Sequence, residues 1–463
     1  MKSKRQTPLV CAIRARWSIH WRKWETVRRS CILLLVVYLR LLRGYKRMQI
    51  RSHLGFIGAA IVLASAGGAY AQNLTITNAR ILDGTGKVIE RGAVVVRDGK
   101  IVSVSATAPT TTSGRTINAG GKTVMPAFVE GHRHLVTGDA AQWLTQRAAP
   151  QFQQFLEAGF TTVLAAIDPP QVVEARKRIE AGQMKGPRLY VGTFLPVAGA
   201  TGPPPNGDPA RTDPARGPLP TTPAPAVARD ATIKAVESAK QTGYDYLKVV
   251  LNTTQNGPEV ETLKLIVAEG KKHNMPTIVH AVSVRDTLAA LEAKPDMLVH
   301  TPHIGSLGDD PAAVKKIVDA KIPMTSTLAV FVPHFDTNGA ALFRDGQPFP
   351  WQTLSSAGQG PVNARLLWEA GLVYGYGTDT QWPPKETLAD ELRALRLVFS
   401  PQDIVKIITK NAAAATLHGS EFGTLEPGKL ADIVIIDGDP MRDSEALLKV
   451  VTTIKAGQVV FEK

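Results

Sequence analysis

The sequence has 463 residues, of which 44% are hydrophobic and 20% are charged, so it is long enough to bury one large core. Its formal charge of +14 would suit a nucleic-acid partner, but residues 1–71 hold 14 of the basic residues and one acid, which leaves 40 basic and 39 acidic residues. Both cysteines, Cys11 and Cys31, lie in the same segment. Composition therefore argues against a nucleic-acid partner, a disulfide framework and cysteine metal ligands for the rest of the chain.

The first segment has the features of an export signal. From Met48 the chain reads "MQIRSHLGFIGAAIVLASAGGAYAQ", with a basic start, an apolar stretch and an A-x-A ending. This pattern predicts a signal peptide over 48–71 and a periplasmic or secreted protein that begins at Gln72. Residues 1–47 then read as an upstream extension from a mis-assigned start. The alternative is a true N-terminus with a membrane anchor at 31–42, but that run is too short to span a bilayer and contains Arg40.

Both ends of the remaining chain are rich in expected strands. Near the start stand "LTITNARIL" and "AVVVRDGKIVSVSA", the second with a turn at Asp98-Gly99. Near the end stand "ADIVIIDG" and "VVTTIKAGQVVFEK". Because the middle of the chain has a different pattern, we expect residues 72–124 and 420–463 to pair into one small β-sandwich domain.

The middle of the chain, residues 125–419, alternates short apolar runs with amphipathic segments. The expected strands are "TVMPAFVEGH" and residues 160–167, 187–193, 245–251, 276–280, 296–300, 322–328 and 372–379. Eight strands that alternate with helices predict a (β/α)8 TIM barrel of the α/β class. A doubly wound sheet would need a glycine-rich turn after the first strand, and the sequence has none there.

One segment of the expected barrel breaks this alternation. Residues 200–228 contain nine prolines, a density that excludes helix and central strand. The segment follows the third expected strand and so belongs to the carboxyl end of the barrel, where catalytic groups collect in this fold. A lid over the site and a solvated loop without a role both remain open.

Five of the eight expected strands supply groups that can bind metal: three end in histidines, one contains a lysine and one is followed by an aspartate. A strand directs residues i and i+2 to one side, about 7 Å apart, so both histidines of "GHRH" could reach one ion. Each group alone has an ordinary explanation, such as a hydrogen-bonded histidine, an outward lysine or a helix-capping aspartate. Their coincidence at one end of the barrel indicates a metal site. The residues are His132, His134, Lys248, His280, His300 and Asp379.

The motifs around these residues resemble those of a known family. They are "GKTVMPAFVEGHRHL", "DYLKVVL", "IVHA", "LVHTPH", "YGTDT" and "FGTLEPGKLADIVIIDGDP". They resemble the amidohydrolase superfamily, in its imidazolonepropionase-like and prolidase-like branch, over about residues 73–460. The family's fold is a distorted barrel flanked by a small β-sandwich from both termini, as the strand pattern also indicates.

The resemblance implies two divalent metal ions and a role for each residue. His132 and His134 would hold the more buried ion together with Asp379, while His280 and His300 would hold the second. Lys248 would carry a CO2-derived carbamate that bridges the two ions. Nitrogen and oxygen ligands suit Zn²⁺ first, with Mn²⁺ or Co²⁺ as alternatives. Asp379 would also be catalytic, taking a proton from the attacking water and passing it to the leaving amine.

Three positions depart from the family pattern or extend it. Arg133 stands between the first two histidines; by alternation it points away from the metals, and its charge needs a partner. Around His300 the branch usually reads "EHG", whereas this chain reads "VHT". His303 follows in the next loop and is interpreted either as a substrate contact or as an exposed loop histidine.

The expected function is that of an exported binuclear amidohydrolase that cleaves a C–N amide bond by a metal-bound hydroxide. Its expected substrates are small amides, either N-acyl amino acids or dipeptides of the Xaa-Pro type. Alternatives are a cyclic amide such as an imidazolone ring, an ester or lactone, and a non-catalytic periplasmic binding protein. We expect no nucleic-acid partner and no stable membrane span in the mature form, and a homo-oligomer stays open.

Overall fold

The computed structural model describes residues 73–107, 109, 114–197, 225–253, 257–332, 334–335, 341–342 and 354–463. The predicted extension (1–47), the predicted signal peptide (48–71) and residues 200–224 of the proline-rich segment lie outside the described residues. Export therefore stays a prediction. Among the helices of the described ranges, none is long and apolar enough to cross a membrane.

Strands from both ends of the chain form one sheet, which we call the terminal sheet. Its order is β18-β17-β16-β5-β1-β2-β3, with β4 paired to β1. The expected turn at Asp98-Gly99 joins β2 to β3, and both residues have positive φ (48° and 74°), as a two-residue type I′ turn requires. The strands are β1 (Leu74–Leu82), β2 (Val88–Arg97), β3 (Lys100–Ser105), β4 (Arg115–Asn118), β5 (Thr123–Pro126), β16 (Ile433–Ile436), β17 (Val450–Lys455) and β18 (Gln458–Glu462).

Eight parallel strands form the barrel, in the order β15-β12-β11-β10-β9-β8-β7-β6. Main-chain hydrogen bonds close it between its first and last strands: Gly131 donates to Tyr376 (3.1 Å) and Asp379 donates to His132 (2.7 Å). The strands are β6 (Phe128–Arg133), β7 (Phe160–Ala165), β8 (Arg188–Phe194), β9 (Tyr246–Val250), β10 (Thr277–His280), β11 (Met297–Val299), β12 (Met324–Thr325) and β15 (Tyr374–Gly375). The predicted TIM barrel with a terminal β-domain is confirmed.

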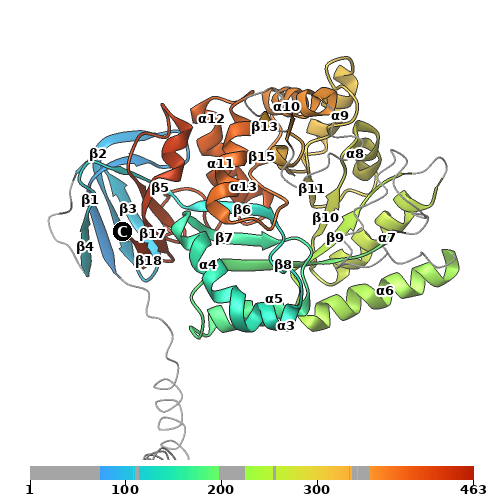
Figure 1. Ribbon diagram of the computed structural model, residues 1–463, viewed down its shortest axis with the longest axis horizontal. Coiled ribbons are helices and arrows are strands. Elements are labelled where there is room, and N and C mark those ends of the chain that lie inside the picture. The colour runs from blue at the N-terminus through green and yellow to red at the C-terminus, as the bar shows by residue number, and fades with distance from the viewer. Residues whose placement is uncertain are drawn as a thin grey trace, which may run out of the picture. The chain divides into compact units, whose positions relative to one another are not determined.

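Helices cover the outside of the barrel strands (Figure 1). Helix α9, for example, turns the buried side chains of Ala313 and Ile317 inward. The main helices are α4 (Ala148–Glu157), α5 (Pro170–Glu180), α6 (Pro225–Thr242), α7 (Glu259–Lys272), α8 (Val284–Leu291), α9 (Pro311–Asp319), α10 (Leu354–Glu369), α11 (Pro384–Leu395), α12 (Pro401–Lys406) and α13 (Ala412–Ala415). Shorter elements are α3 (Ala140–Gln142), η1 (Trp143–Arg147), η2 (Leu328–Val330), η3 (Ile407–Asn411), η4 (Ser444–Leu448), β13 (His334–Phe335) and β14 (Ala341–Leu342).

The expected first barrel strand, "TVMPAFVEGH", is two strands. β5 pairs with β1 and β16 in the terminal sheet, whereas β6 starts the barrel after Ala127. The main-chain N–H of Ala127 donates to the Asp432 carbonyl (2.9 Å) at this crossing. All residues of both strands are buried, so the apolar run continues from one core into the next and gives no sign of the break.

The expected extent of the proline-rich segment is four residues too long. Helix α6 begins at Pro225, so residues 225–228 are helical. Proline is accepted in the first turn of a helix because the N–H that it lacks would have no helical partner there.

Candidate metal centre

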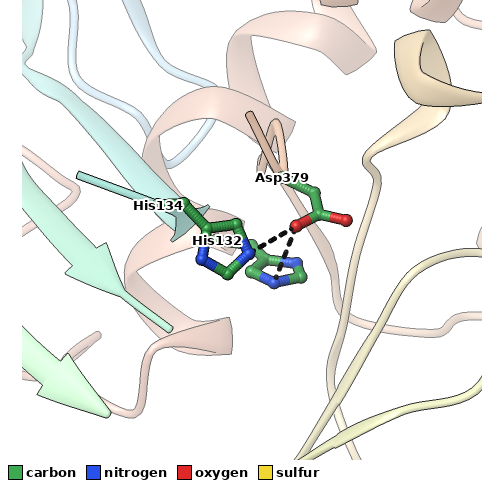
Figure 2. A group of neighbouring side chains, drawn as sticks. All are labelled: His132, His134 and Asp379. Atoms are coloured by element: carbon green, nitrogen blue, oxygen red, sulfur yellow. Dashed lines mark hydrogen bonds and ion pairs between the residues drawn. The ribbon is translucent and has the colours of Figure 1, made fainter. Parts of the chain in front are cut away.

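His132, His134 and Asp379 meet at the carboxyl end of the barrel (Figure 2). His132 belongs to β6, His134 follows it directly, and Asp379 lies in the segment after β15. Asp379 Oδ1 is 2.8 Å from His134 Nε2 and 3.4 Å from His132 Nε2. All three residues are buried, and one ligand atom from each lies within 4.8 Å of the others. This is a donor set that can hold a metal ion.

The hydrogen bonds of His134 indicate which of its two ring nitrogens can face a metal ion. His134 Nδ1 lies 3.2 Å from the Ile167 carbonyl oxygen, which can only accept, so Nδ1 carries a proton. In the neutral ring, Nε2 then presents its lone pair to the Asp379 carboxylate at 2.8 Å. Two acceptors at this distance repel each other unless a proton or a cation lies between them. A second proton on the ring or a divalent cation meets that requirement, and the carbonyl on Nδ1 is a usual partner of a metal-binding histidine.

The other predicted ligands reach the same place from the neighbouring strands. Lys248, on β9, places its Nζ 3.0 Å from His132 Nε2. His300, directly after β11, has its ring centroid 4.9 Å from that of His132 and 4.3 Å from that of His280 at the end of β10. His300 Nε2 lies 3.6 Å from Asp379 Oδ2 and has no hydrogen-bond partner among the described residues. The structure thus brings all six predicted residues together.

Burial keeps two of these histidines neutral. It lowers the pKa of His132 well below its usual value, with the nearby Lys248 lowering it further and Asp379 opposing both. Burial likewise lowers the pKa of His300, followed by the effect of His280. A neutral imidazole has a lone pair for a metal, whereas an imidazolium has none. The burial of the site therefore favours the protonation state that metal binding needs.

Three residues at the site have left-handed backbone conformations that side chains other than glycine seldom adopt. Their φ angles are 50° for Asp379, 75° for His300 and 50° for Thr327. Such conformations cost free energy and persist only where the surroundings hold them. Two of the three are predicted ligands, and the third contacts a ligand.

Thr327 is a partner of His300 that the sequence did not indicate. Its Oγ1 is 2.7 Å from His300 Nδ1, so with the proton on Nδ1 the ring directs the lone pair of Nε2 toward Asp379. Glu391 of α11 accepts hydrogen bonds from the main chain of Leu328 (2.9 Å) and Ala329 (2.8 Å), directly after Thr327. Burial raises the pKa of Glu391 to about 7 against these bonds. No sequence spacing connects these residues.

Glu130 is a second residue that the sequence analysis missed. Its Oε1 accepts the main-chain N–H groups of His132 and Thr378 (3.0 Å each), and its Oε2 accepts from the Thr378 hydroxyl (2.8 Å). Burial raises the pKa of Glu130 to about 7, against the opposing effect of Arg133. The signal was available, because Glu130 stands two residues before His132 and alternation places the two on the same side of the strand.

Arg133 points away from the predicted ligands, as alternation indicates, and its side chain is fully buried. Its Nη1 donates to the hydroxyls of Thr378 and Thr387 (3.1 Å each), and its Nη2 donates to the Trp382 carbonyl. Its guanidinium carbon lies 5.2 Å from the centre of the Phe155 ring. The partners described for its charge are therefore three hydrogen-bond acceptors and a ring, and the charge also acts on the nearby Glu130 carboxyl, whose pKa it lowers.

His303 is buried, so its interpretation as an exposed loop histidine is wrong. Its ring stacks on Phe331 with centroids 3.8 Å apart, and its main-chain N–H donates to the Val282 carbonyl (2.8 Å). A Cβ atom on Gly360 of α10 would overlap this ring, so glycine is what leaves room for it. A substrate contact of His303 stays a prediction.

Comparisons with known proteins agree with this geometry. Residues 123–460 match the sequence model of the Amidohydrolase family. Imidazolonepropionase from Shouchella clausii (strain KSM-K16) is 26% identical over 434 residues, which cover 81% of this chain and 86% of the relative.

Two solved structures share the fold. A Xaa-Pro dipeptidase with bound methionine in its active site has a TM-score of 0.67 at 18% identity, and the match covers 84% of this chain and 100% of the other. A prolidase complexed with N-methylphosphonate-L-proline has a TM-score of 0.65 at 20% identity, with the same coverage of 84% and 100%. Together with the family match over most of its length, the described site identifies this chain as a member of the amidohydrolase family, a metal-dependent hydrolase that acts on carbon–nitrogen bonds.

Proposed function

We propose that this chain hydrolyses the amide bond of a small N-acyl amino acid or Xaa-Pro dipeptide, with two divalent ions at the six clustered residues. The observation that carries the proposal is the approach of His134 Nε2 to the Asp379 carboxylate (2.8 Å), with Lys248 Nζ 3.0 Å from His132 Nε2. The substrate class is supported by the names of the structural neighbours, a Xaa-Pro dipeptidase and a prolidase. Zn²⁺ is the ion that best suits nitrogen and oxygen ligands without sulfur.

The two halves of the site would each hold one ion. His132, His134 and Asp379, which we call the first half, lie on β6 and after β15. Lys248, His280 and His300, the second half, come from β9, β10 and the end of β11. When bound, such ions polarise a carbonyl group and lower the pKa of water.

Lys248 would join the two halves. An ammonium group cannot ligate a cation, but the neutral amine can add to CO2, forming an N–C bond and releasing a proton. The resulting carbamate would share one negative charge between two oxygens, which would supply ligand atoms to both halves. The Nζ atom lies 3.0 Å from His132 Nε2, at the boundary between the two histidine pairs.

Asp379 would transfer the proton. Its carboxylate takes a proton from water as the water oxygen attacks the amide carbon, and it delivers that proton to the leaving nitrogen as the C–N bond breaks. The products are an acid and an amine, so no other reactant is needed. The left-handed backbone at Asp379 fixes where the carboxylate stands.

A second candidate, hydrolysis of a cyclic amide such as an imidazolone ring, is favoured by one observation. The imidazolonepropionase relative matches 81% of this chain, and ring opening breaks the same kind of bond. The same six residues would serve either substrate.

The experiment is a metal count joined to a substrate screen on the full chain. We expect about two Zn²⁺ per chain and turnover of Xaa-Pro dipeptides or N-acyl amino acids rather than of imidazolone propionate. The variant Lys248→Ala should bind fewer ions and lose activity, whereas Lys315→Ala, on the exposed surface of α9, is the matched control. A Lys248→Ala chain with two ions and full activity would overturn the bridging role, and turnover of the imidazolone alone would select the second candidate.

Export completes the proposal. N-terminal sequencing of the chain recovered from outside the cytoplasm should begin at Gln72. A chain that stays inside the cell with its first residues intact would contradict it.

A further inference from the structure

Arg133 is a buried cation between two predicted metal ligands, and the proposed reaction gives it no task. Removing a guanidinium from water is unfavourable unless its donors find partners, so a buried arginine points to a set of contacts that depends on it. The partners of Arg133 identify the segment that it holds.

These partners lie on both sides of Asp379. Arg133 donates to the hydroxyl of Thr378, the residue directly before Asp379, and to the carbonyl of Trp382, three residues after it. A third hydrogen bond reaches Thr387 in the first turn of α11. One planar side chain therefore holds the segment that carries Asp379 at both ends.

The segment between these anchors is also tied to β6 through its main chain. The N–H of Asp379 donates to the His132 carbonyl (2.7 Å), and the N–H of His134 donates to the Thr380 carbonyl (3.3 Å). Asp379 itself has φ of 50°, a conformation that relaxes when the chain around it is released. Such a relaxation would move the carboxylate from the two imidazoles that it faces.

We propose that Arg133 is a positioning residue that sets the place of the Asp379 carboxylate relative to His132 and His134. It acts from the far side of β6, through Thr378 and Trp382, without touching the ion. Lysine could replace its charge but not its planar fork, which bonds several acceptors at once. The inference rests on the proposed metal site and adds a residue to its support.

The test measures Zn²⁺ affinity of the full chain by competition with a chelator, together with the visible spectrum after Co²⁺ substitution. Arg133→Met should weaken Zn²⁺ binding about 10–100-fold, the usual effect of losing a group that orients a ligand. Arg133→Lys should recover part of that loss. Thr387→Val, which removes the hydrogen bond from Arg133 to α11, should give a smaller loss in the same direction.

The control is Phe155→Leu. It removes the aromatic ring that the Arg133 guanidinium contacts but leaves the hydrogen bonds from Arg133 to Thr378 and Trp382 in place. It should lower the thermal midpoint and leave Zn²⁺ affinity and the Co²⁺ spectrum unchanged. A merely structural Arg133 would behave in the same way as this control.

The outcomes separate the inference from the proposed function. A wild-type chain that binds no Zn²⁺ would refute the metal site itself. If the wild type binds Zn²⁺, and Arg133→Met binds it equally well, the inference alone is wrong. Should Arg133→Met fail to fold, unchanged Zn²⁺ affinity in both Arg133→Lys and Thr387→Val would refute it as well.

Discussion

The two halves of the candidate site are held in different ways. In the first half, His132, His134 and Asp379 stand on segments joined by main-chain hydrogen bonds, and Glu130 and Arg133 tie the same segments together by their side chains. In the second half, His300 follows a strand of three residues and is oriented by Thr327, a residue with a left-handed backbone of its own. The first half therefore depends on the main-chain hydrogen bonds that close the barrel between β6 and the segment after β15. The orientation of His300 depends instead on one side-chain hydrogen bond, with Thr327.

The largest effect should come from the first half. Asp379→Asn keeps the shape of the side chain but removes the anionic ligand and the proton acceptor, so kcat should fall by about 10²–10⁴-fold. Steady-state kinetics on the preferred amide would measure it. Asp319→Asn, an exposed carboxylate of α9, is the control and should match the wild type. Near-normal turnover by Asp379→Asn would show that Asp379 is not needed for proton transfer.

A smaller and more selective effect should follow in the second half. Thr327→Val keeps the branched shape but loses the hydroxyl at His300 Nδ1, so the second Zn²⁺ should bind about 10–100-fold more weakly while the first is unaffected. Titration of the metal-free chain with Zn²⁺ resolves the two steps. Thr327→Ser should restore the second step. Equal weakening of both steps would show that the halves are not held independently.

Enlarging a residue of α10 that contacts the loop after His300 should lower the stability of the protein. Gly360→Ala places a methyl group against the His303 ring and should lower the free energy of unfolding by about 1–3 kcal/mol. Gly358→Ala, in the same helix, meets no atom within 4 Å and should be neutral or stabilising by up to about 1 kcal/mol. Urea denaturation of the two variants gives the comparison. Equal stabilities would mean that His303 can move aside.

The last expected effect is on the pH dependence of stability, within a single pH unit no larger than that of the glycine variants. The pKa of Glu391 is raised from 4.5 to about 7 by burial, so between these values the unfolded chain releases a proton that the folded chain keeps. The contribution of Glu391 to stability is therefore complete below pH 4.5 and is lost as the pH rises through 7, by at most about 1.4 kcal/mol per pH unit.

Glu391→Gln cannot titrate and should remove this part of the slope. Denaturation of the metal-free chain between pH 5 and pH 7.5, for wild type and variant, measures the difference in slope. Parallel curves would show that Glu391 is ionised throughout that range.

Local signals predicted much of the architecture. The barrel strands and the Asp98-Gly99 turn were predicted because each depends on a local pattern. A short apolar run indicates a buried strand, and an Asp-Gly pair indicates a tight turn, within a few residues. Five of the six clustered residues were found because they stand at or just after the end of a strand, and Lys248 because it lies inside one; the barrel fold brings these strands together. Their roles as ligands stay predictions.

The supports of the site were not predicted, because their partners are far apart in sequence. Glu130 and Thr378 are 248 positions apart, and Leu328 and Glu391 are 63 apart. No periodicity reports such a contact. The break between β5 and β6 was missed for another reason: Thr123 to Arg133 are buried almost throughout, in two different cores, so hydrophobicity does not change at the boundary.

The place of β5 in the terminal sheet has a consequence for how the chain is made. β5 lies between β1 and β16, and Thr123 pairs with Ile436, roughly 310 positions later. During synthesis β5 can join β1 early, but its other edge meets its neighbour only when nearly the whole chain has left the ribosome. Until then that edge is an apolar strand open to other chains. Translation that stops before β16 should therefore yield a product prone to aggregation, even though every predicted metal ligand has already been made.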